Sequence, residues 1–352
     1  MSGALAAIGL RDAGCRVTIA AAAGGRAHYD ALGIAWSLVP TLDSPDFLRT
    51  IDALVRQHNV DYVLPLTEPL QALLWDQQMT WGDRIFPRPS ARHRALLRDK
   101  YSLSAFVSHC GVQIPEQLPL DEAVGAAIES LGLPMVVKGI AGSGGRKTRI
   151  VQSLGEATAA AARMRREGMR SFAQRYVSGL TFLVGGTFSQ GRPLRIYAGV
   201  KLAQYPARTG PASLIESVRD EQLIDQARRV FGALEWSGVA SADFVRDADG
   251  RYWFLEMNPR PWGSIAAAKA AGVDLWSPLA AMLAGEELPA DLRFSEGVAY
   301  SVVPLAFLSP ASWRGRGSVV TSLRAERKLW RPIGQALHLM HRLARMASRW
   351  AR

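Results

Sequence analysis

The sequence predicts a mixed α/β protein that is built from more than one packed unit. Strand and helix patterns alternate over residues 1–88, which indicates a parallel sheet. Pairs of β-forming runs joined by short turns follow, which indicates antiparallel hairpins. The 352 residues are 48% hydrophobic with a mean hydropathy of +0.02, a composition ordinary for a globular enzyme with sizeable cores.

The first region begins on a helix and then alternates between strands and helices. The predicted elements are Met1–Ala13, Val17–Ala20, Ile34–Val39, Ser44–Gln57, Tyr62–Leu66 and a helix after Pro69. A Pro-rich boundary at residues 87–89 precedes Ser90, which is predicted to cap a basic helix. Lys100 opens the helix after that one, and on its own it is typical of a surface lysine.

A glycine-rich segment follows a predicted strand that ends near Lys138. Its glycines allow backbone N–H groups to approach a phosphate closely. A Walker loop is excluded because Arg146 replaces its required glycine, and because residues 148–151 have a strand pattern where that loop would continue into a helix. We therefore expect a hairpin lid, with a flexible hairpin that binds no ligand as the alternative. The lid residues are Gly142, Ser143, Gly144 and Gly145.

The second half of the chain is expected to be rich in antiparallel strands. A strand over Ser171–Val177 ends before Gly179, and Leu180–Phe188 and Leu194–Leu202 form the next hairpin. From Asp220 to Leu234 the apolar residues occupy one helical face, which indicates a core helix.

A further hairpin is predicted to bring two carboxylates and an amide together. Its arms are Phe244–Arg246 and Tyr252–Met257, joined by an Asp- and Gly-containing turn. Because side chains alternate between the faces of a strand, Asp243, Glu256 and Asn258 are expected on one face. Such an all-oxygen set suits Mg²⁺ when phosphates and water complete its coordination. A solvated acidic hairpin is the alternative.

Arg260 directly follows these residues and would place a guanidinium beside the cation, able to clamp a carboxylate or a phosphate. This combination favours phosphoryl chemistry. The segment from Asp243 to Arg260 resembles the metal-binding end of the ATP-grasp superfamily, in which an acidic residue is followed by Glu-x-Asn-x-Arg. Asn258-Pro-Arg-Pro-Trp-Gly-Ser264 is similar to the branch related to the large chain of carbamoyl-phosphate synthase and to carboxylate-amine ligases.

The resemblance implies roles for residues that have no signal of their own. It implies a two-lobed ATP-grasp core in which the lid and two lysines hold phosphates and a hinge binds adenine through its backbone. The nucleotide residues it implies are Lys100, Lys138, Gly142, Ser143, Gly144, Gly145, Gln174, Tyr176 and Val177, the metal residues are Asp243, Glu256 and Asn258, and the catalytic residues are Arg260 and Lys201. Whether Glu68 faces this site or belongs to a plain strand-to-helix junction is left open.

The sequence departs from the family pattern at four positions. Gly139 replaces the usual Pro after the strand lysine, and Lys147 replaces a common Gly in the lid. Arg175 replaces the commoner Glu of the hinge, and Thr181 stands where many relatives carry an acid that holds the ribose. These changes put the lid conformation and the nucleotide affinity in question more than the fold.

The function implied is that of an ATP-dependent, ADP-forming carboxylate-amine ligase that acts through an acyl phosphate. ATP and Mg²⁺ are the implied cofactors, with Mn²⁺ as an alternative metal, and the substrates are a small carboxylate and an amine. Two alternatives remain: phosphorylation of a small carboxylate of the carbamoyl-phosphate-synthase type, and an inactive ATP-binding scaffold. A homodimer is a further expectation.

The expected organisation has four parts. Residues 1–88 form a Rossmann-like domain that lacks its first strand, residues 89–178 the small lobe with the lid, and residues 179–295 the large lobe with the metal and substrate site. Residues 296–352 form an extension with a basic amphipathic helix.

The net charge of +11 is concentrated in the tail, where residues 313–352 carry +9. Apolar residues line one face of residues 323–352 and arginines the other, which indicates contact with an anionic membrane surface, a partner, or the protein's own body. No nucleic-acid-binding module accompanies this charge. Without a predicted membrane span or secretory signal, the expected location is the cytoplasm, with the inner membrane face as an extension of it.

Overall fold

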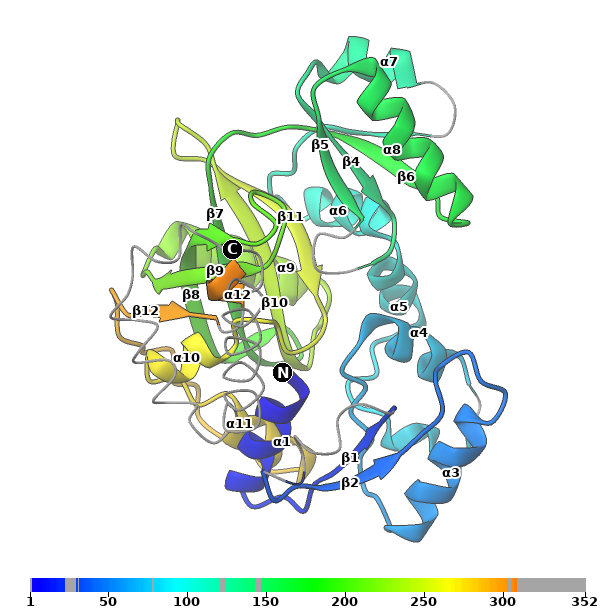
Figure 1. Ribbon diagram of the computed structural model, residues 1–352. Helices are drawn as coiled ribbons and strands as arrows, with labels where there is room; N and C mark the ends of the chain where they lie inside the picture. Colours follow the sequence, from blue (N-terminus) through cyan, green and yellow to red (C-terminus); the bar gives the residue numbers. More distant parts are fainter. Residues whose placement is uncertain are drawn as a thin grey trace, which may run out of the picture.

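The computed structural model describes residues 2–22, 30, 32–77, 79–120, 124–142, 147–302 and 305–308. Within them three sheets follow one another along the chain: the two-stranded β1-β2, the four-stranded β3-β6-β4-β5 and the six-stranded β11-β10-β7-β8-β9-β12. Figure 1 shows the first sheet low in the molecule, the second at the top and the third between them. The protein is therefore mixed α/β, as predicted.

The N-terminal region packs helices around a short parallel sheet. Its elements are α1 (Ser2–Asp12), β1 (Thr18–Ala21), β2 (Ala35–Leu38), α3 (Phe47–Gln57), α4 (Glu68–Asp76) and the 3₁₀ turn η1 (Gly82–Arg84). β1 and β2 pair in parallel, as the alternation predicted. The expected strand Tyr62–Leu66 is wrong, because there the described residues form only one bridge, Val63 with Ile85. Pro65 lacks the N–H group that would continue the ladder.

The four-stranded sheet is covered on one face by two helices (Figure 1). This part contains α5 (Ala91–Arg98), α6 (Lys100–His109), β3 (Gln117–Pro119), α7 (Val124–Leu131), β4 (Met135–Gly139), β5 (Thr148–Val151), α8 (Leu154–Arg166) and β6 (Ser171–Arg175). The helices begin where the sequence places caps. Ser90 accepts a hydrogen bond from the His93 N–H, and Asp99 accepts from the N–H groups of Tyr101 and Ser102. The Asp99 cap fixes Lys100 as the first residue of α6.

The six-stranded sheet is antiparallel throughout. Its elements are β7 (Leu180–Ser189), β8 (Arg192–Gln204), β9 (Ala212–Ser217), α9 (Glu221–Ala233), β10 (Gly238–Arg246), β11 (Tyr252–Asn258), α10 (Ala266–Ala270), α11 (Trp276–Leu283), β12 (Ala299–Ser301) and α12 (Leu305–Leu308). One face packs on α9 and the other on α10 and α11. With both faces covered, eight of the nine β10 residues are buried, including the polar Ser241 and Asp243.

Several predictions fall on residues beyond those described. The basic amphipathic helix of residues 323–352 and the lid residues Ser143, Gly144 and Gly145 lie outside the described residues. The Rossmann-like assignment and the four domain boundaries stay predictions. Among the residues that the structure describes, no helix combines the length and apolar character needed to cross a bilayer.

Gly9 marks a close helix contact that a side chain would disturb. A Cβ at this position of α1 would lie 2.1 Å from Cδ1 of Trp276 on α11. We expect Gly9→Ala to destabilise the protein by about 1–3 kcal/mol, because the tryptophan must move. Urea unfolding measures the change. Gly155→Ala is the matched control: nothing lies within 4 Å of its Cβ on α8, so it should be neutral or stabilising. An equal loss in both variants would contradict this interpretation.

Candidate active site

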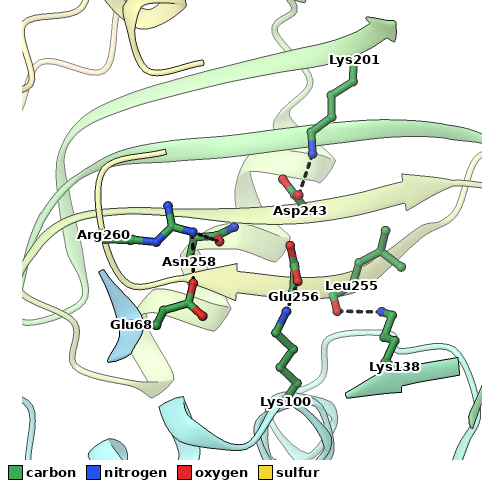
Figure 2. A network of polar contacts seen from close by, with 9 residues as sticks. All are labelled: Glu68, Lys100, Lys138, Lys201, Asp243, Leu255, Glu256, Asn258 and Arg260. Carbon is green, nitrogen blue, oxygen red and sulfur yellow. Dashed lines mark hydrogen bonds and ion pairs between the residues drawn. The ribbon is translucent and has the colours of Figure 1, made fainter. Parts of the chain in front are cut away.

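The β10-β11 hairpin places the predicted metal residues on one face of the large sheet. Asp243 lies directly opposite Glu256 in the antiparallel register, and Ser241 lies opposite Asn258. A bulge follows Asp243, and Gly250 closes the turn with a φ of +83°, a value that favours glycine. The two carboxylates come together from opposite strands, as predicted (Figure 2). The bulge is what allows this, because Phe244 pairs with Phe254 and strict alternation would place Glu256 on the face opposite to Asp243.

Each of these carboxylates is ion-paired with a lysine from another element. Lys201 Nζ on β8 lies 2.6 Å from Asp243 Oδ2, and Lys100 Nζ on α6 lies 2.5 Å from Glu256 Oε2. The first pair is buried, with 4% and 11% of its side chains exposed, whereas the second is at 18% and 23%. Lys138 on β4 donates to the Leu255 carbonyl oxygen at 3.3 Å. Three lysines thus surround the hairpin (Figure 2).

Burial and neighbouring charges move the pKa values of this cluster in different directions. Burial by itself raises the pKa of Glu256, but the three ammonium groups outweigh it and lower the pKa to about 2. Burial raises the pKa of Asp243 more than Lys201 lowers it, and the nearby Glu256 charge adds to the rise. Burial lowers the pKa of Lys138 to about 8, even though Glu256 favours its charged form. The pKa values of the two carboxylates are thereby shifted in opposite directions, a pattern common at functional sites.

The oxygen atoms at this point fit a hard divalent cation. Asp243 Oδ1 is buried and has no hydrogen-bond partner among the described residues. Asn258 Oδ1 accepts a hydrogen bond from Arg260 at 3.2 Å, and an amide oxygen has a second lone pair for another ligand. In the described part of the chain, no group of three or more His, Cys, Asp and Glu residues could hold a metal. Two carboxylates and an amide suit Mg²⁺ when substrate phosphates supply further oxygens.

Arg260 is held at the end of β11 by a residue from the N-terminal region. Its Nη2 lies 3.1 Å from Oε1 of Glu68, the first residue of α4. Burial raises the pKa of Glu68 more than Lys100 and Arg260 lower it. Of the two interpretations left open for Glu68, the structure supports the one in which this residue faces the site.

A cavity of about 450 Å³ connects the hairpin to the exit of β6. Nine of the predicted site residues line it: Lys138, Gln174, Tyr176, Val177, Lys201, Asp243, Glu256, Asn258 and Arg260. Lys100 does not line the cavity but reaches it through Glu256. Gly142 is outside the lining, and its φ of +109° explains the need for glycine there.

The structure gives physical reasons for two of the departures from the family pattern. Arg175 lines the cavity but also pairs with Glu116 at 2.5 Å and donates to the Leu131 carbonyl oxygen, so it ties β6 to the end of α7. Lys147 pairs with Glu167 at the C-terminal end of α8 and anchors the start of β5, which follows it directly. Both replacements therefore have partners within residues 116–167.

Two contributors to the site were not predicted from the sequence. Trp262 lines the cavity and lies so close to β7 that a Cβ on Gly185 would be 2.6 Å from its ring. Gly185-Gly186 within an apolar strand is a signal of such close approach, and it was overlooked. Gln71 on α4, only 1% exposed, donates to the Pro259 carbonyl oxygen at 2.5 Å. No local sequence pattern predicts the contact between Gln71 and Pro259.

Comparisons with known proteins agree with this geometry. A family model described as an ATP-grasp domain matches residues 97–264. Pyruvate carboxylase of Schizosaccharomyces pombe is 26% identical over 221 residues, which cover 58% of this chain and 19% of that protein. D-alanine–D-alanine ligase of Chromohalobacter salexigens is 29% identical over 161 residues, 43% of this chain and 51% of that protein. The chain thus spans about half or less of the length of these relatives.

Solved structures show the same fold at low sequence identity. Biotin carboxylase from Campylobacter jejuni, in a complex with β,γ-ATP, superposes with a TM-score of 0.68 at 17% identity, covering 85% of this chain and 72% of that one. The biotin carboxylase domain of Hydrogenobacter thermophilus 2-oxoglutarate carboxylase, with MgADP, ADP and bicarbonate, gives 0.65 at 17% identity, with coverage of 83% and 70%. Residues 97–264, which contain the lysines and the carboxylate hairpin, are therefore an ATP-grasp domain, and the superfamily predicted from the sequence is confirmed.

Proposed function

We propose that the protein is an ATP-dependent, ADP-forming ligase that joins a carboxylate to an amine through an acyl phosphate. The observation that carries this proposal is the pairing of Asp243 with Glu256 across the hairpin, with three lysines in contact and a cavity leading away. Carboxylates that hold a cation, together with ammonium groups that neutralise phosphates, are the components of phosphoryl transfer. The relatives named above support this reaction class.

Within this function each residue has a distinct task. The backbone of Gln174, Tyr176 and Val177 would hold adenine, and Lys100 and Lys138 would contact the phosphates together with the lid residues 142–145. Asp243, Glu256 and Asn258 would hold Mg²⁺, or Mn²⁺ as an alternative. When bound, the cation would neutralise charge on the β- and γ-phosphates. Lys201 would offset charge on the transferred group, and Arg260 would hold the substrate carboxylate by two N–H groups.

The two chemical steps balance without a further reagent. A carboxylate oxygen attacks the γ-phosphorus, and the bond from that phosphorus to the β,γ-bridging oxygen breaks, which releases ADP. The amine then attacks the acyl carbon, phosphate leaves, and the amine nitrogen loses a proton. The products are an amide, ADP and phosphate. The cavity walls would shield the acyl phosphate from water.

A second candidate is phosphorylation of bicarbonate, which corresponds to the carbamoyl-phosphate-synthase type of chemistry. The observation that favours it is the fold shared with a biotin carboxylase domain that was solved with bicarbonate and MgADP. Arg260 and the lysines suit bicarbonate as well as an organic carboxylate. In this case bicarbonate alone would support ADP release.

An ADP-release assay tests both candidates. ATP and Mg²⁺ are supplied with bicarbonate, or with amino acids and other small carboxylates, each with and without amines. ADP release that requires an organic carboxylate and an amine supports the ligase, and release with bicarbonate alone supports the second candidate. ATP binding without turnover on any pair would favour the inactive scaffold, and absence of ATP binding would overturn both proposals.

The burial of Lys138 predicts an alkaline limit on nucleotide use. With a pKa of about 8 in the free protein, this lysine loses its charge as the pH rises through that value. We expect kcat/KM for ATP to fall above pH 8, because kcat/KM reports the ionisation of the free enzyme. Bound phosphates favour the charged lysine, so kcat should hold to higher pH.

Lys138→Arg provides the control for this pH profile, since arginine stays charged throughout the range. The variant is expected to be less active, but its kcat/KM should stay constant between about pH 7 and pH 9. Arginine ionises only above about pH 12, so its charge does not change in this range. An unchanged alkaline limit in this variant would assign the titration to another group.

We also propose that residues 1–88 have a Rossmann-like fold, that the protein is a homodimer and that it is located in the cytoplasm. Contact between residues 323–352 and a membrane or a partner has no support among the described residues, because this segment lies outside them. Co-flotation with anionic vesicles, compared with a chain lacking this segment, tests the membrane contact.

A further inference from the structure

The first turn of α4 touches the active-site loop at two points. Glu68 Oε1 accepts a hydrogen bond from Arg260 Nη2 at 3.1 Å, and Gln71 Nε2 donates to the Pro259 carbonyl oxygen at 2.5 Å. Residues three apart share one face of a helix, so both contacts come from the same side of α4. The contact with Glu68 fixes the guanidinium (Figure 2), and the contact with Gln71 fixes the backbone that carries it.

α4 is itself firmly anchored. Thr67 caps its N-terminus by accepting from the Leu70 N–H, and Trp75 Nε1 donates to the Pro87 carbonyl oxygen at 2.8 Å. Arg98 on α5 pairs with Asp76 at 2.7 Å and donates to the Ala72 carbonyl oxygen at 3.0 Å. α5 leads directly to the Asp99 cap and to Lys100, which pairs with Glu256. The contacts of Arg98 therefore tie α4, which holds Arg260, to the segment that carries Lys100.

The position of Arg260 needs such support. Arg260 lies four residues after Glu256 and lines the same cavity as Asp243 and Glu256, so a long unrestrained side chain at this place has two carboxylates as competing partners. Glu68 and Asn258 instead hold Nη2 from two sides, and Nη1 donates to the Pro261 carbonyl oxygen at 3.2 Å. The Glu68 and Arg260 side chains are 21% and 15% exposed, so water competes weakly for this contact.

We propose that Glu68 and Gln71 are positioning residues for Arg260, so that the N-terminal region supplies part of the active site. Both lie outside residues 97–264, the span matched by the ATP-grasp model. Glu68 keeps the guanidinium turned away from Asp243 and Glu256. Gln71 fixes the position of the backbone at Pro259, directly before Arg260. The role rests on the proposed function, in which Arg260 holds the substrate carboxylate.

A chemical probe tests the contact independently of any substrate. Phenylglyoxal reacts with free guanidinium groups, and peptide mass spectrometry gives the labelling rate at Arg260 in the intact protein. We expect Glu68→Gln to raise that rate about tenfold, the factor that corresponds to losing one charge-assisted hydrogen bond. Glu68→Asp should restore part of the protection, and Gln71→Met should also raise the rate. Equal rates in wild type and Glu68→Gln would overturn the proposal.

Asp83→Asn is the matched control for these variants. It removes another ion pair of the N-terminal region, the 2.5 Å contact with Arg88, at the protein surface. Its Arg260 labelling rate should equal that of the wild type. Faster labelling in this variant as well would show general loosening and contradict a specific role for Glu68.

Steady-state kinetics separate positioning from general structural support. The probe is the carboxylate that gives the most ADP release in the panel described above. Glu68→Gln should raise KM for that carboxylate about tenfold and leave KM for ATP within about twofold. Parallel changes in both constants would overturn the proposal. If no carboxylate gives ADP release, the proposed function fails, and the labelling rates still decide the role of Glu68.

Discussion

Glu256→Gln is expected to lower ATP-dependent ADP release on the order of 10³-fold, the upper range for losing one preorganised electrostatic group. Glutamine has nearly the same shape but no charge. The variant therefore lacks the carboxylate proposed to hold the cation, and Lys100 loses the charged partner that lies 2.5 Å away. The Mg²⁺ concentration needed for half-maximal rate should rise as well, because a neutral amide is a poorer ligand for a hard cation.

The control for this result is Glu221→Gln, which removes the 3.0 Å ion pair with Arg219 at the surface. Its rate should match the wild type. Circular dichroism and the unfolding midpoint of Glu256→Gln show whether the variant remains folded. A folded Glu256→Gln variant with nearly full turnover would contradict the assignment of the metal site.

Lys201→Met is expected to destabilise the protein by about 3–5 kcal/mol at neutral pH, the typical cost of breaking a buried ion pair from one side. Asp243 would keep its charge in a buried place without its 2.6 Å partner. The double variant Lys201→Met/Asp243→Asn should recover most of this loss, because it leaves no unpaired charge. Urea unfolding measures both, with the exposed Lys269→Met as control.

The pH dependence of this loss follows from the direction of the Asp243 pKa. Burial raises the pKa of Asp243 in the folded protein, and removal of Lys201 raises it further. Protonation in the folded state therefore relieves the unpaired charge. The stability deficit of Lys201→Met should shrink as the pH falls through the raised pKa and be largest at neutral and alkaline pH. A deficit that stays constant with pH, or a double variant as unstable as the single one, would contradict the role of this pair.

Local patterns predicted the hairpin and its turn. The period of two places Glu256 and Asn258 on one face of β11, and the Asp-containing turn supplies the reversal. The bulge after Asp243, which no local pattern predicted, is what brings Asp243 to that face. The caps at Ser90 and Asp99 were likewise local signals. The predicted strand Tyr62–Leu66 was wrong because Pro65 has no N–H group to donate to a neighbouring strand, although the run is otherwise apolar.

Partners distant in the sequence were not predictable in this way. Lys100 and Glu256 are 156 positions apart, and Glu68 and Arg260 are 192 apart. The resemblance to the superfamily indicated that Lys100 and Lys201 belong to the site, but it assigned them to phosphates rather than to the carboxylates. A side chain's partner in the absence of a ligand depends on the balance of burial and charge, which periodicity does not contain.

The lysines that surround the hairpin also stabilise the two carboxylates when no ligand is bound. Two carboxylates facing each other in a buried place repel one another and lose hydration. Here each already has an ammonium counter-ion from a separate element, and Lys138 adds a third positive charge nearby. The negative charge of the two carboxylates is thus offset by the protein's own lysines. Binding of a metal nucleotide at this point would exchange one set of ionic partners for another, with little creation of new charge in the interior.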